Sequence, residues 1–253
     1  MAARFDGAVA LVTGGGSGIG RAIALAFAAE GATVVVAGRG AAGLVETVAQ
    51  VEAAGGKGSH VVADVAVSSD AAAMVRACVE THGGLHVAVN NAGVFTRPAA
   101  TADIPEPDWD AAVATNLTGT WLAMKHEIAH MRAHGGGAIV NVASNIGWHG
   151  RRPGMAAYAA TKAAVSALTR AAARDHIADG IRINAVSPGA TDTPLSMRPG
   201  ETAADRDTRL AGLVPLGRVG STAEVAAGVL WLASGESTFA VGHDLVLDGG
   251  VTA

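Results

Sequence analysis

Short apolar runs alternate along the chain with longer segments in which apolar residues recur at helical spacing. The apolar runs cover residues 8–14, 33–38, 59–64, 86–91, 138–144, 181–187 and 244–250. Most of these runs are rich in valine and apolar at nearly every position, as expected for strands that are buried on both faces. The pattern predicts a parallel sheet of about seven strands.

The segments between the runs are predicted to be helices. They cover residues 19–30, 41–54, 68–82, 108–134, 154–178 and 222–234. Strand–helix alternation indicates a doubly wound α/β fold, with helices on both faces of the sheet. The sequence has no internal repeat and no linker that marks a boundary, so we expect one domain over residues 1–253.

The segment 192–217 departs from this alternation. It carries Pro194, Pro199, Gly200 and Pro215 among many charged residues. We interpret it as an excursion above the sheet that acts as a substrate lid, and a surface insertion without function is the alternative.

Composition narrows the class of protein. Of the 253 residues, 50% are hydrophobic and 16% are charged, which is typical of a globular chain. The net charge is −4 and no basic block occurs, so nucleic acid and anionic membranes are not expected partners. The single cysteine, Cys78, excludes an internal disulfide. We find no signal peptide and no apolar run of about 18 residues, so we expect no membrane span and a cytoplasmic location.

The residues TGGGSGIG, 13–20, join the first predicted strand to the first predicted helix. Glycine at this density costs entropy, and such turns bring the backbone close to a phosphate at a helix N-terminus. A triphosphate-binding loop ends in Gly-Lys-Ser/Thr, whereas Arg21 and Ala22 follow Gly20 here. The turn therefore favours a dinucleotide, and a tight strand–helix turn without a ligand is the alternative.

The chain as a whole resembles the short-chain dehydrogenase/reductase family. Eight motifs of that family occur in order, namely TGxxxGxG at 13–20, Asp64-Val65, NNAG at 90–93, Asn116, Ser144, YxxxK at 158–162, Pro188-Gly189 and DGG at 248–250. The resemblance implies a Rossmann-type fold that transfers hydride between a nicotinamide cofactor and a small secondary alcohol or ketone. It also implies a homo-oligomer, either a tetramer or a dimer.

Tyr158 and Lys162 lie four residues apart in a predicted helix and therefore share one face. Tyr158 is the only tyrosine. A free tyrosine has a pKa of about 10, and a nearby ammonium group lowers it. We therefore expect Lys162, with an oxidised nicotinamide, to lower the pKa of Tyr158. In the family this tyrosine exchanges a proton with the substrate. The alternative is an amphipathic helix in which Tyr158 and Lys162 have no catalytic role.

Ser144 and Asn116 complete the catalytic set that the resemblance implies. Ser144 ends a predicted strand, where its hydroxyl can hold a carbonyl; a serine that caps the following turn is the alternative. The interval to Tyr158 is one residue longer than is usual in the family, so we expect a lengthened loop and consider Asn145 as a competing register. Asn116 is a poor helix former within a helical pattern, and in the family it bends its helix and holds a water linked to the lysine; a solvent-facing asparagine is the alternative.

The predicted choice between NADP(H) and NAD(H) rests on Arg39. Gly38 occupies the place where sites selective for NAD carry an acid, and Arg39 follows it. A guanidinium suits a 2′-phosphate, so we predict NADP(H) over NAD(H), with a solvent-exposed Arg39 as the alternative. The other cofactor contacts implied by the resemblance are Gly14, Ser17, Gly18, Ile19, Gly20, Asp64, Val65, Asn91, Ala92, Gly93, Tyr158, Lys162, Pro188, Gly189, Thr191 and Thr193. Candidates for the substrate wall are Trp148, His149, Met155, Leu195 and Met197.

His126, His130 and His134 recur every four residues, a spacing at which two histidines can bind zinc. No HExxH motif is present and the expected chemistry needs no metal, so we interpret them as a polar or subunit-facing stripe. The sequence thus predicts a carbonyl reductase or alcohol dehydrogenase. A dinucleotide-binding sensor or scaffold that has lost the chemistry is the alternative, since fold alone does not decide function.

Overall fold

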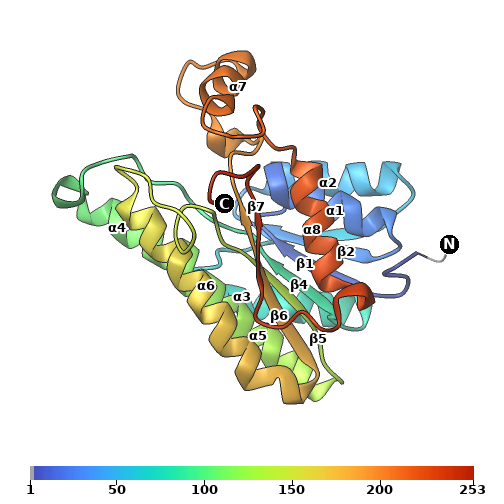
Figure 1. Cartoon of the computed structure of the whole chain (residues 1–253). Helices are drawn as coiled ribbons and strands as arrows, with labels where there is room; N and C mark the ends of the chain where they lie inside the picture. The colour runs from blue at the N-terminus through green and yellow to red at the C-terminus, as the bar shows by residue number, and fades with distance from the viewer. Residues whose placement is uncertain (1–2) are drawn as a thin grey trace.

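The computed structural model describes residues 3–253, which contain one parallel sheet with the strand order β3-β2-β1-β4-β5-β6-β7 (Figure 1). The strands are β1 (Val9–Thr13), β2 (Thr33–Gly38), β3 (Lys57–Val62), β4 (Val87–Asn90), β5 (Gly137–Val142), β6 (Ile181–Pro188) and β7 (Asp244–Leu247). The order reverses between β1 and β4, and in sheets of this type the ligand site lies at the carboxyl ends of the strands at such a point. The predicted doubly wound fold is confirmed.

Helices cover both faces of the sheet (Figure 1). One face carries α1 (Gly18–Ala29), α2 (Ala41–Ala53) and α8 (Thr222–Ala233), and the other carries α3 (Ser68–His82), α5 (Gly119–Ala133) and α6 (Ala156–His176). Alternate residues of β1 serve the two cores: Ala10 and Val12 pack with α1 and α8, whereas Val9 and Leu11 pack with α3 and α5. Within residues 3–253, no helix has both the length and the hydropathy needed to cross a bilayer.

The helix predicted over 108–134 is interrupted in the structure. It divides into α4 (Glu106–Ala112), a π-helical turn (Val113–Thr118) and α5. Asn116 lies in the π-helical turn and is fully buried. A π-helical turn changes the hydrogen-bond register of the helix, and such turns are frequent at functional sites.

The segment 192–217 contains a helix that the sequence analysis did not predict. Helix α7 (Ala203–Ala211) begins with a capping box in which Thr202 accepts a hydrogen bond from the backbone of Asp205 and the Asp205 side chain accepts one from Thr202. Figure 1 shows α7 standing apart from the two layers of helices. The prolines that suggested an irregular excursion flank this short helix, whereas most of the charged residues of the segment lie within it.

Candidate active site

Helix α6 carries Tyr158 and Lys162 on its buried side, with 8% and 4% of their surfaces exposed. The Lys162 ammonium group donates a hydrogen bond of 2.7 Å to the carbonyl oxygen of Val142, where β5 ends. It lies 6.0 Å from the centre of the Tyr158 ring. The helix and the strand end thus bring the phenol and the ammonium group to the carboxyl end of β5.

Burial dominates the titration of both groups. It raises the pKa of Tyr158 above its ordinary value, while the hydrogen bond with Ser144 acts in the opposite direction. It lowers the pKa of Lys162 to about 8. The expectation that Lys162 and an oxidised nicotinamide together lower the pKa of Tyr158 concerns the cofactor-bound state and stays a prediction.

Ser144 lies two residues beyond β5 and is 6% exposed. Its hydroxyl accepts a hydrogen bond of 3.1 Å from the backbone of Ile146 and bonds to the Tyr158 side chain. The amide of Asn145, the competing register, is turned instead toward Asp248 at 3.2 Å. Ser144 is therefore the side chain that the structure places beside the phenol.

Asn116 links the π-helical turn to the residue after the NNAG motif. Its Oδ1 accepts a hydrogen bond of 2.8 Å from the Val94 amide, and its Nδ2 donates to the Val94 carbonyl at 3.1 Å. Nδ2 also lies 3.2 Å from Oγ1 of Thr161, which precedes Lys162. A methyl group on Gly93 would lie 3.3 Å from Oδ1 of Asn116 and 3.5 Å from Nζ of Lys162, so the structure brings these two side chains together. The solvent-facing alternative for Asn116 is wrong.

The lengthened loop after Ser144 folds back on itself. Ile146 and Gly150 form a short bridge, and Gly150 donates a hydrogen bond of 2.7 Å to the Asn145 carbonyl.

The candidates for the substrate wall differ in their surroundings. Trp148 stacks on Arg170 of α6, with 4.3 Å between the guanidinium carbon and the ring centre. His149 bonds to Asp244 at 2.9 Å. Trp148 and His149, two of the candidates for the substrate wall, therefore already have partners within the protein. Of the other candidates, Met155 is buried, Met197 is half-buried and Leu195 is exposed.

The sequence analysis did not identify Phe95, an aromatic neighbour of Tyr158. The ring centres of Phe95 and Tyr158 lie 4.8 Å apart with an angle of 51° between the ring planes, and Phe95 is 40% exposed. Its position two residues after the NNAG motif is the signal that the sequence offered.

The glycine turn is compressed between α1 and the end of β4. Gly14 has a φ of +65°, and a methyl group on Gly20 would lie 2.2 Å from the Gly14 carbonyl oxygen. The hydroxyl of Thr13 accepts hydrogen bonds from the amides of Asn91 and Ala92 at 3.0 and 3.1 Å. Only glycine fits such a cradle, and a bare backbone at this point suits the close approach of a dinucleotide.

Helix α1 begins at Gly18, and the side chain of its N-cap residue, Ser17, makes no hydrogen bond to the first turn. The first amides of Ile19 and its neighbours are therefore free of a side-chain cap, and the positive end of the helix dipole suits a pyrophosphate. Thr193 covers this end, because a methyl group on Gly18 would lie 3.5 Å from its side chain. The glycine turn and the segment 188–193 thus face each other, as a shared cofactor site requires.

Arg39 directly follows β2 and is exposed. Within residues 3–253 it forms no ion pair and no side-chain hydrogen bond, which leaves its guanidinium available to a ligand. Arg21, the other arginine near the turn, is occupied: it pairs with Glu46 at 2.7 Å and donates to the Gly16 carbonyl at 2.6 Å.

The remaining predicted cofactor residues lie at the ends of neighbouring strands. Asp64 accepts a hydrogen bond of 3.0 Å from the Ala66 amide, and Val65 is buried against Gly119. Pro188 ends β6, and the Gly189 amide donates to Leu247 at 2.9 Å. The structure therefore gathers these residues along the carboxyl edge of the sheet.

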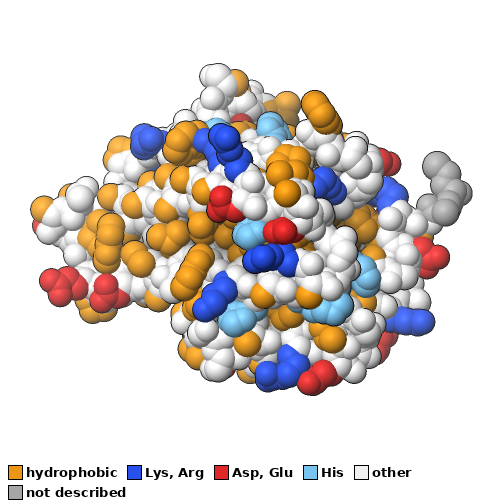
Figure 2. Space-filling model, turned by 90° about the horizontal axis from the view of Figure 1, so that it is seen from below, with side chains coloured by type: hydrophobic (Ala, Val, Ile, Leu, Met, Phe, Trp, Pro, Cys, Tyr) orange, Lys and Arg blue, Asp and Glu red, His pale blue; other side chains and the backbone are white. Residues whose placement is uncertain are grey.

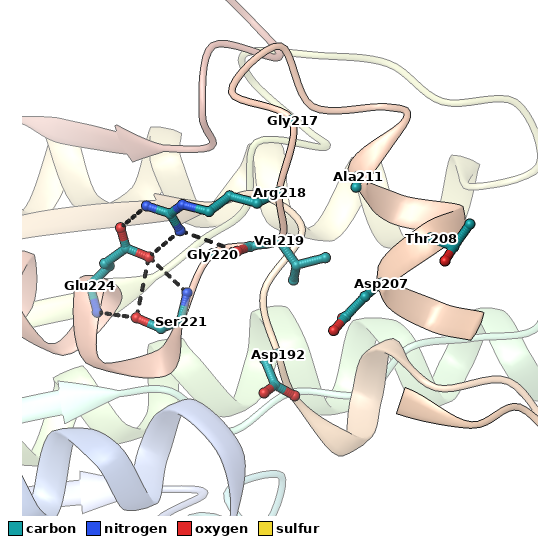
Figure 3. A pocket seen from close by; sticks show the side chains of 10 residues that line it. All are labelled: Asp192, Asp207, Thr208, Ala211, Gly217, Arg218, Val219, Gly220, Ser221 and Glu224. Atoms are coloured by element: carbon teal, nitrogen blue, oxygen red, sulfur yellow. Dashed lines mark hydrogen bonds and ion pairs between the residues drawn. The ribbon is translucent and has the colours of Figure 1, made fainter. Parts of the chain in front are cut away.

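A cavity of about 640 Å³ lies between α7 and the segment that precedes α8 (Figure 3). Asp192, Asp207, Arg218 and Glu224 are among its lining residues, whereas Ser144, Tyr158 and Lys162 are not. In Figure 3, Arg218 turns toward Glu224 and away from α7. This cavity is therefore separate from the Tyr158 site, although Asp192 directly follows Thr191, one of the predicted cofactor residues.

The histidines of α5 do not gather into a metal site. His130 and His134 stack with 4.1 Å between ring centres, and the His126 ring lies 3.5 Å from the Ser68 hydroxyl. Over residues 3–253, no group of three histidine, cysteine or acidic side chains has the arrangement of a metal-binding cluster.

Comparisons with known proteins agree with this geometry. A family model described as Enoyl-(Acyl carrier protein) reductase matches residues 14–252. The 3-oxoacyl-(acyl-carrier-protein) reductase FabG of Thermotoga maritima is 39% identical over 248 residues, 98% of this chain and 99% of the relative. The cyclohexanol dehydrogenase of Acinetobacter sp. strain SE19 is 38% identical over 253 residues, 100% of this chain and 98% of the relative. The crystal structure of levodione reductase matches with a TM-score of 0.93 at 34% identity and covers 98% of this chain and 99% of that one.

Proposed function

Because the chain belongs to the short-chain dehydrogenase/reductase family, we propose that it is an NADP(H)-dependent oxidoreductase that interconverts a secondary alcohol and a ketone. The observation that carries the proposal is the convergence of Ser144, Tyr158, Lys162 and Asn116 at the sheet edge, beside the glycine cradle. A dinucleotide-binding sensor or scaffold needs the cradle alone, so the catalytic set favours an enzyme.

In the reducing direction, the hydroxyls of Ser144 and Tyr158 hold the substrate carbonyl oxygen. When bound, the reduced nicotinamide supplies the hydride that the carbonyl carbon accepts. Tyr158 donates its proton to the oxygen, and the alcohol leaves. Because burial raises its pKa, Tyr158 holds this proton at neutral pH until the substrate oxygen takes it. Lys162 stabilises the phenolate that remains, and Asn116 holds the backbone of Val94 and the side chain of Thr161, which precedes Lys162.

Tyr158→Phe tests this role, since the ring that packs on Phe95 stays while the proton is lost. General acid catalysis contributes about 10²–10⁴-fold, so we expect kcat to fall by at least about 100-fold. The assay screens ketones and alcohols that include 3-oxoacyl thioesters and cyclohexanone. A variant that turns over substrate at the parental rate would show that the mechanism is wrong.

We propose Arg39 as the residue that selects NADP(H), because its guanidinium is exposed and unengaged where a 2′-phosphate is expected. A charge-assisted hydrogen bond stabilises by about 1.5–3 kcal/mol, which predicts a preference of roughly 10- to 100-fold for NADPH over NADH in kcat/KM. Arg39→Ala should remove most of it, whereas Arg76→Ala, on the exposed side of α3, should not. Equal use of the two cofactors by the parent would refute the assignment.

We propose that the segment 192–217 is the substrate lid and that α7 is its rigid part. Arg206 of α7 is only 3% exposed and pairs with Asp192 and Asp207, so one buried guanidinium holds the helix over the segment that follows β6. The substrate is expected to enter between this lid and Phe95.

We also propose that the chain forms a homo-oligomer through α5 and α6. Trp121 is 47% exposed beside a groove that Ala129, Leu168 and Ala171 line. Figure 2, a view from below, shows hydrophobic side chains beside histidine and basic ones on this side of the molecule. Light scattering of the parent and of Trp121→Glu measures the assembly, and a monomeric parent would refute it.

A further inference from the structure

The C-terminal turn 248–252 is built around the carboxylate of Asp248. Its Oδ1 accepts hydrogen bonds from the amides of Gly250 and Val251 at 3.0 and 3.2 Å. Its Oδ2 accepts from the hydroxyl of Thr252 at 2.8 Å and from the side-chain amide of Asn145 at 3.2 Å. Within residues 3–253 no cation pairs with Asp248, so four neutral donors hold its charge.

One of these donors belongs to the residue that follows Ser144. Asn145 is 7% exposed, its backbone amide donates to the Pro188 carbonyl at 3.0 Å, and its carbonyl accepts from Gly150 at 2.7 Å. Its side chain is the part that reaches Asp248. Asn145 therefore connects the loop after Ser144 to the C-terminal turn, at the loop that carries one residue more than is usual in the family.

The same turn touches two further parts of the site. A methyl group on Gly189 would lie 2.6 Å from Cβ of Asp248, so the two backbones are in close contact. The Leu216 amide, at the end of the segment 192–217, donates to the Gly249 carbonyl at 3.1 Å. Asp248 thus stands where the Ser144 loop, the segment after β6 and the end of the lid meet.

We propose that Asp248 is a positioning residue, which holds the hydroxyl of Ser144 in place through Asn145. The proposal rests on the proposed function, because it assigns Asp248 a part in hydride transfer without contact to substrate or cofactor. A displacement of about 1 Å at a catalytic group can cost about 100-fold in rate. The hydrogen bonds within the loop hold its own shape, but they do not tie it to the C-terminal turn. The hydrogen bond from the Asn145 side chain to Asp248 adds this tie.

Asp248→Asn tests the link with little change in shape. Oδ1 can still accept from Gly250 and Val251, but an NH₂ group then faces the NH₂ group of Asn145. We expect kcat to fall by about 10-fold or more. The Kd of NADPH, measured by fluorescence, should stay within about 2-fold, because the glycine turn and Arg39 are untouched. Thr252→Val, the matched control, removes the other donor to Oδ2 and should leave kcat within about 2-fold of the parent.

Two double variants separate positioning from a general structural defect. Asn145→Asp with Asp248→Asn restores one hydrogen bond in the reverse direction and should recover most of the lost kcat. In a Ser144→Ala background, Asp248→Asn should cause little further loss, because the group that it positions is gone. Equal losses in the two backgrounds, or no recovery in the swap, would overturn the proposal.

Hydrogen exchange gives a readout that does not need turnover. Amides of the loop 145–150 should exchange at least about 10-fold faster in Asp248→Asn than in the parent, while those of α3 stay unchanged. Unchanged exchange in the loop overturns the positioning role even if the enzyme is active. A parent without turnover on any substrate refutes the proposed function instead, and loop exchange still decides whether Asp248 holds the loop.

Discussion

The ammonium group of Lys162 donates a hydrogen bond to the carbonyl oxygen of Val142, 2.7 Å away, in a part of the molecule that water barely reaches. Burial lowers the pKa of this lysine to about 8. The charged form is therefore less favourable in the folded protein than in the unfolded chain, where its pKa is near 10.5. The stability of the protein is reduced as pH falls through this range.

Lys162→Met should raise the stability of the protein and lower its activity. The free energy of unfolding should rise by about 1–3 kcal/mol at pH 7, because a buried charge is replaced by an apolar side chain. The gain should shrink to about 0.4 kcal/mol near pH 10.5, where the parental lysine is neutral in the folded protein and half-charged in the unfolded chain. Denaturant unfolding of both proteins at pH 7 and 10.5 measures this, and a gain that persists in full at pH 10.5 would exclude the charge as its cause. Turnover should fall by about 100-fold or more.

Glu127 of α5 is a second buried ionisable group whose pKa is shifted by burial. It is fully buried, it accepts a hydrogen bond of 3.0 Å from Asn90, and burial raises its pKa to about 7. The folded protein thus keeps a proton that the unfolded chain has released, so stability falls as pH rises from about 4.5 to 7.

Glu127→Gln should abolish that pH dependence. The difference in unfolding free energy between the variant and the parent should grow by about 3 kcal/mol from pH 4.5 to pH 8. The new amide can also donate to Oδ1 of Asn90, which has no partner within residues 3–253. Chemical unfolding of both proteins across this range gives the difference directly. A constant difference at every pH would mean that Glu127 is ionised in the folded state.

Gly20→Ala should prevent the glycine turn from closing. The new methyl group would lie 2.2 Å from the Gly14 carbonyl oxygen and 2.6 Å from Nδ2 of Asn91, so the backbone must move. We expect a loss of about 1–3 kcal/mol of stability and at least about 10-fold weaker binding of NADPH, measured by fluorescence titration. Gly235→Ala is the matched control, because open space surrounds that position. Tight binding by Gly20→Ala would place the dinucleotide elsewhere.

Arg206→Met should release the lid. The variant keeps an unbranched side chain but loses the pairs with Asp192 and Asp207, and buried charge-assisted hydrogen bonds contribute about 1.5–3 kcal/mol. We expect KM for the substrate to rise by about 10-fold or more, with the Kd of NADPH changed far less. Arg218→Met, which breaks an exposed pair with Glu224, should have little effect. If both variants behave alike, the segment 192–217 is not a lid.

Periodicity and spacing were sufficient for the parts of the fold that depend on neighbours in the chain. The strand that ends at Thr13, the turn to Gly20 and the helix after it were predicted correctly, because valine runs and glycine act locally. The predicted helix over 108–134 is interrupted at Asn116, the residue where the resemblance implied a bend, and the side chain of Asn116 binds the distant backbone of Val94. Helix α7 was missed because its two capping residues stand between prolines that suggested an irregular segment.

The shared helix face of Tyr158 and Lys162 was readable from the sequence, because residues four apart lie on one side of a helix. Their electrostatics were not. Only the packing of α6 against β5 buries both side chains, and this burial lowers the pKa of Lys162 and raises the pKa of Tyr158. The contact between Asn145 and Asp248 likewise joins residues that are 103 positions apart. The sequence determined which chemical groups the chain carries and which local elements hold them; the tertiary structure alone decided which groups lose their water and which distant partners they meet, because desolvation and long-range hydrogen bonds exist only in the packed state.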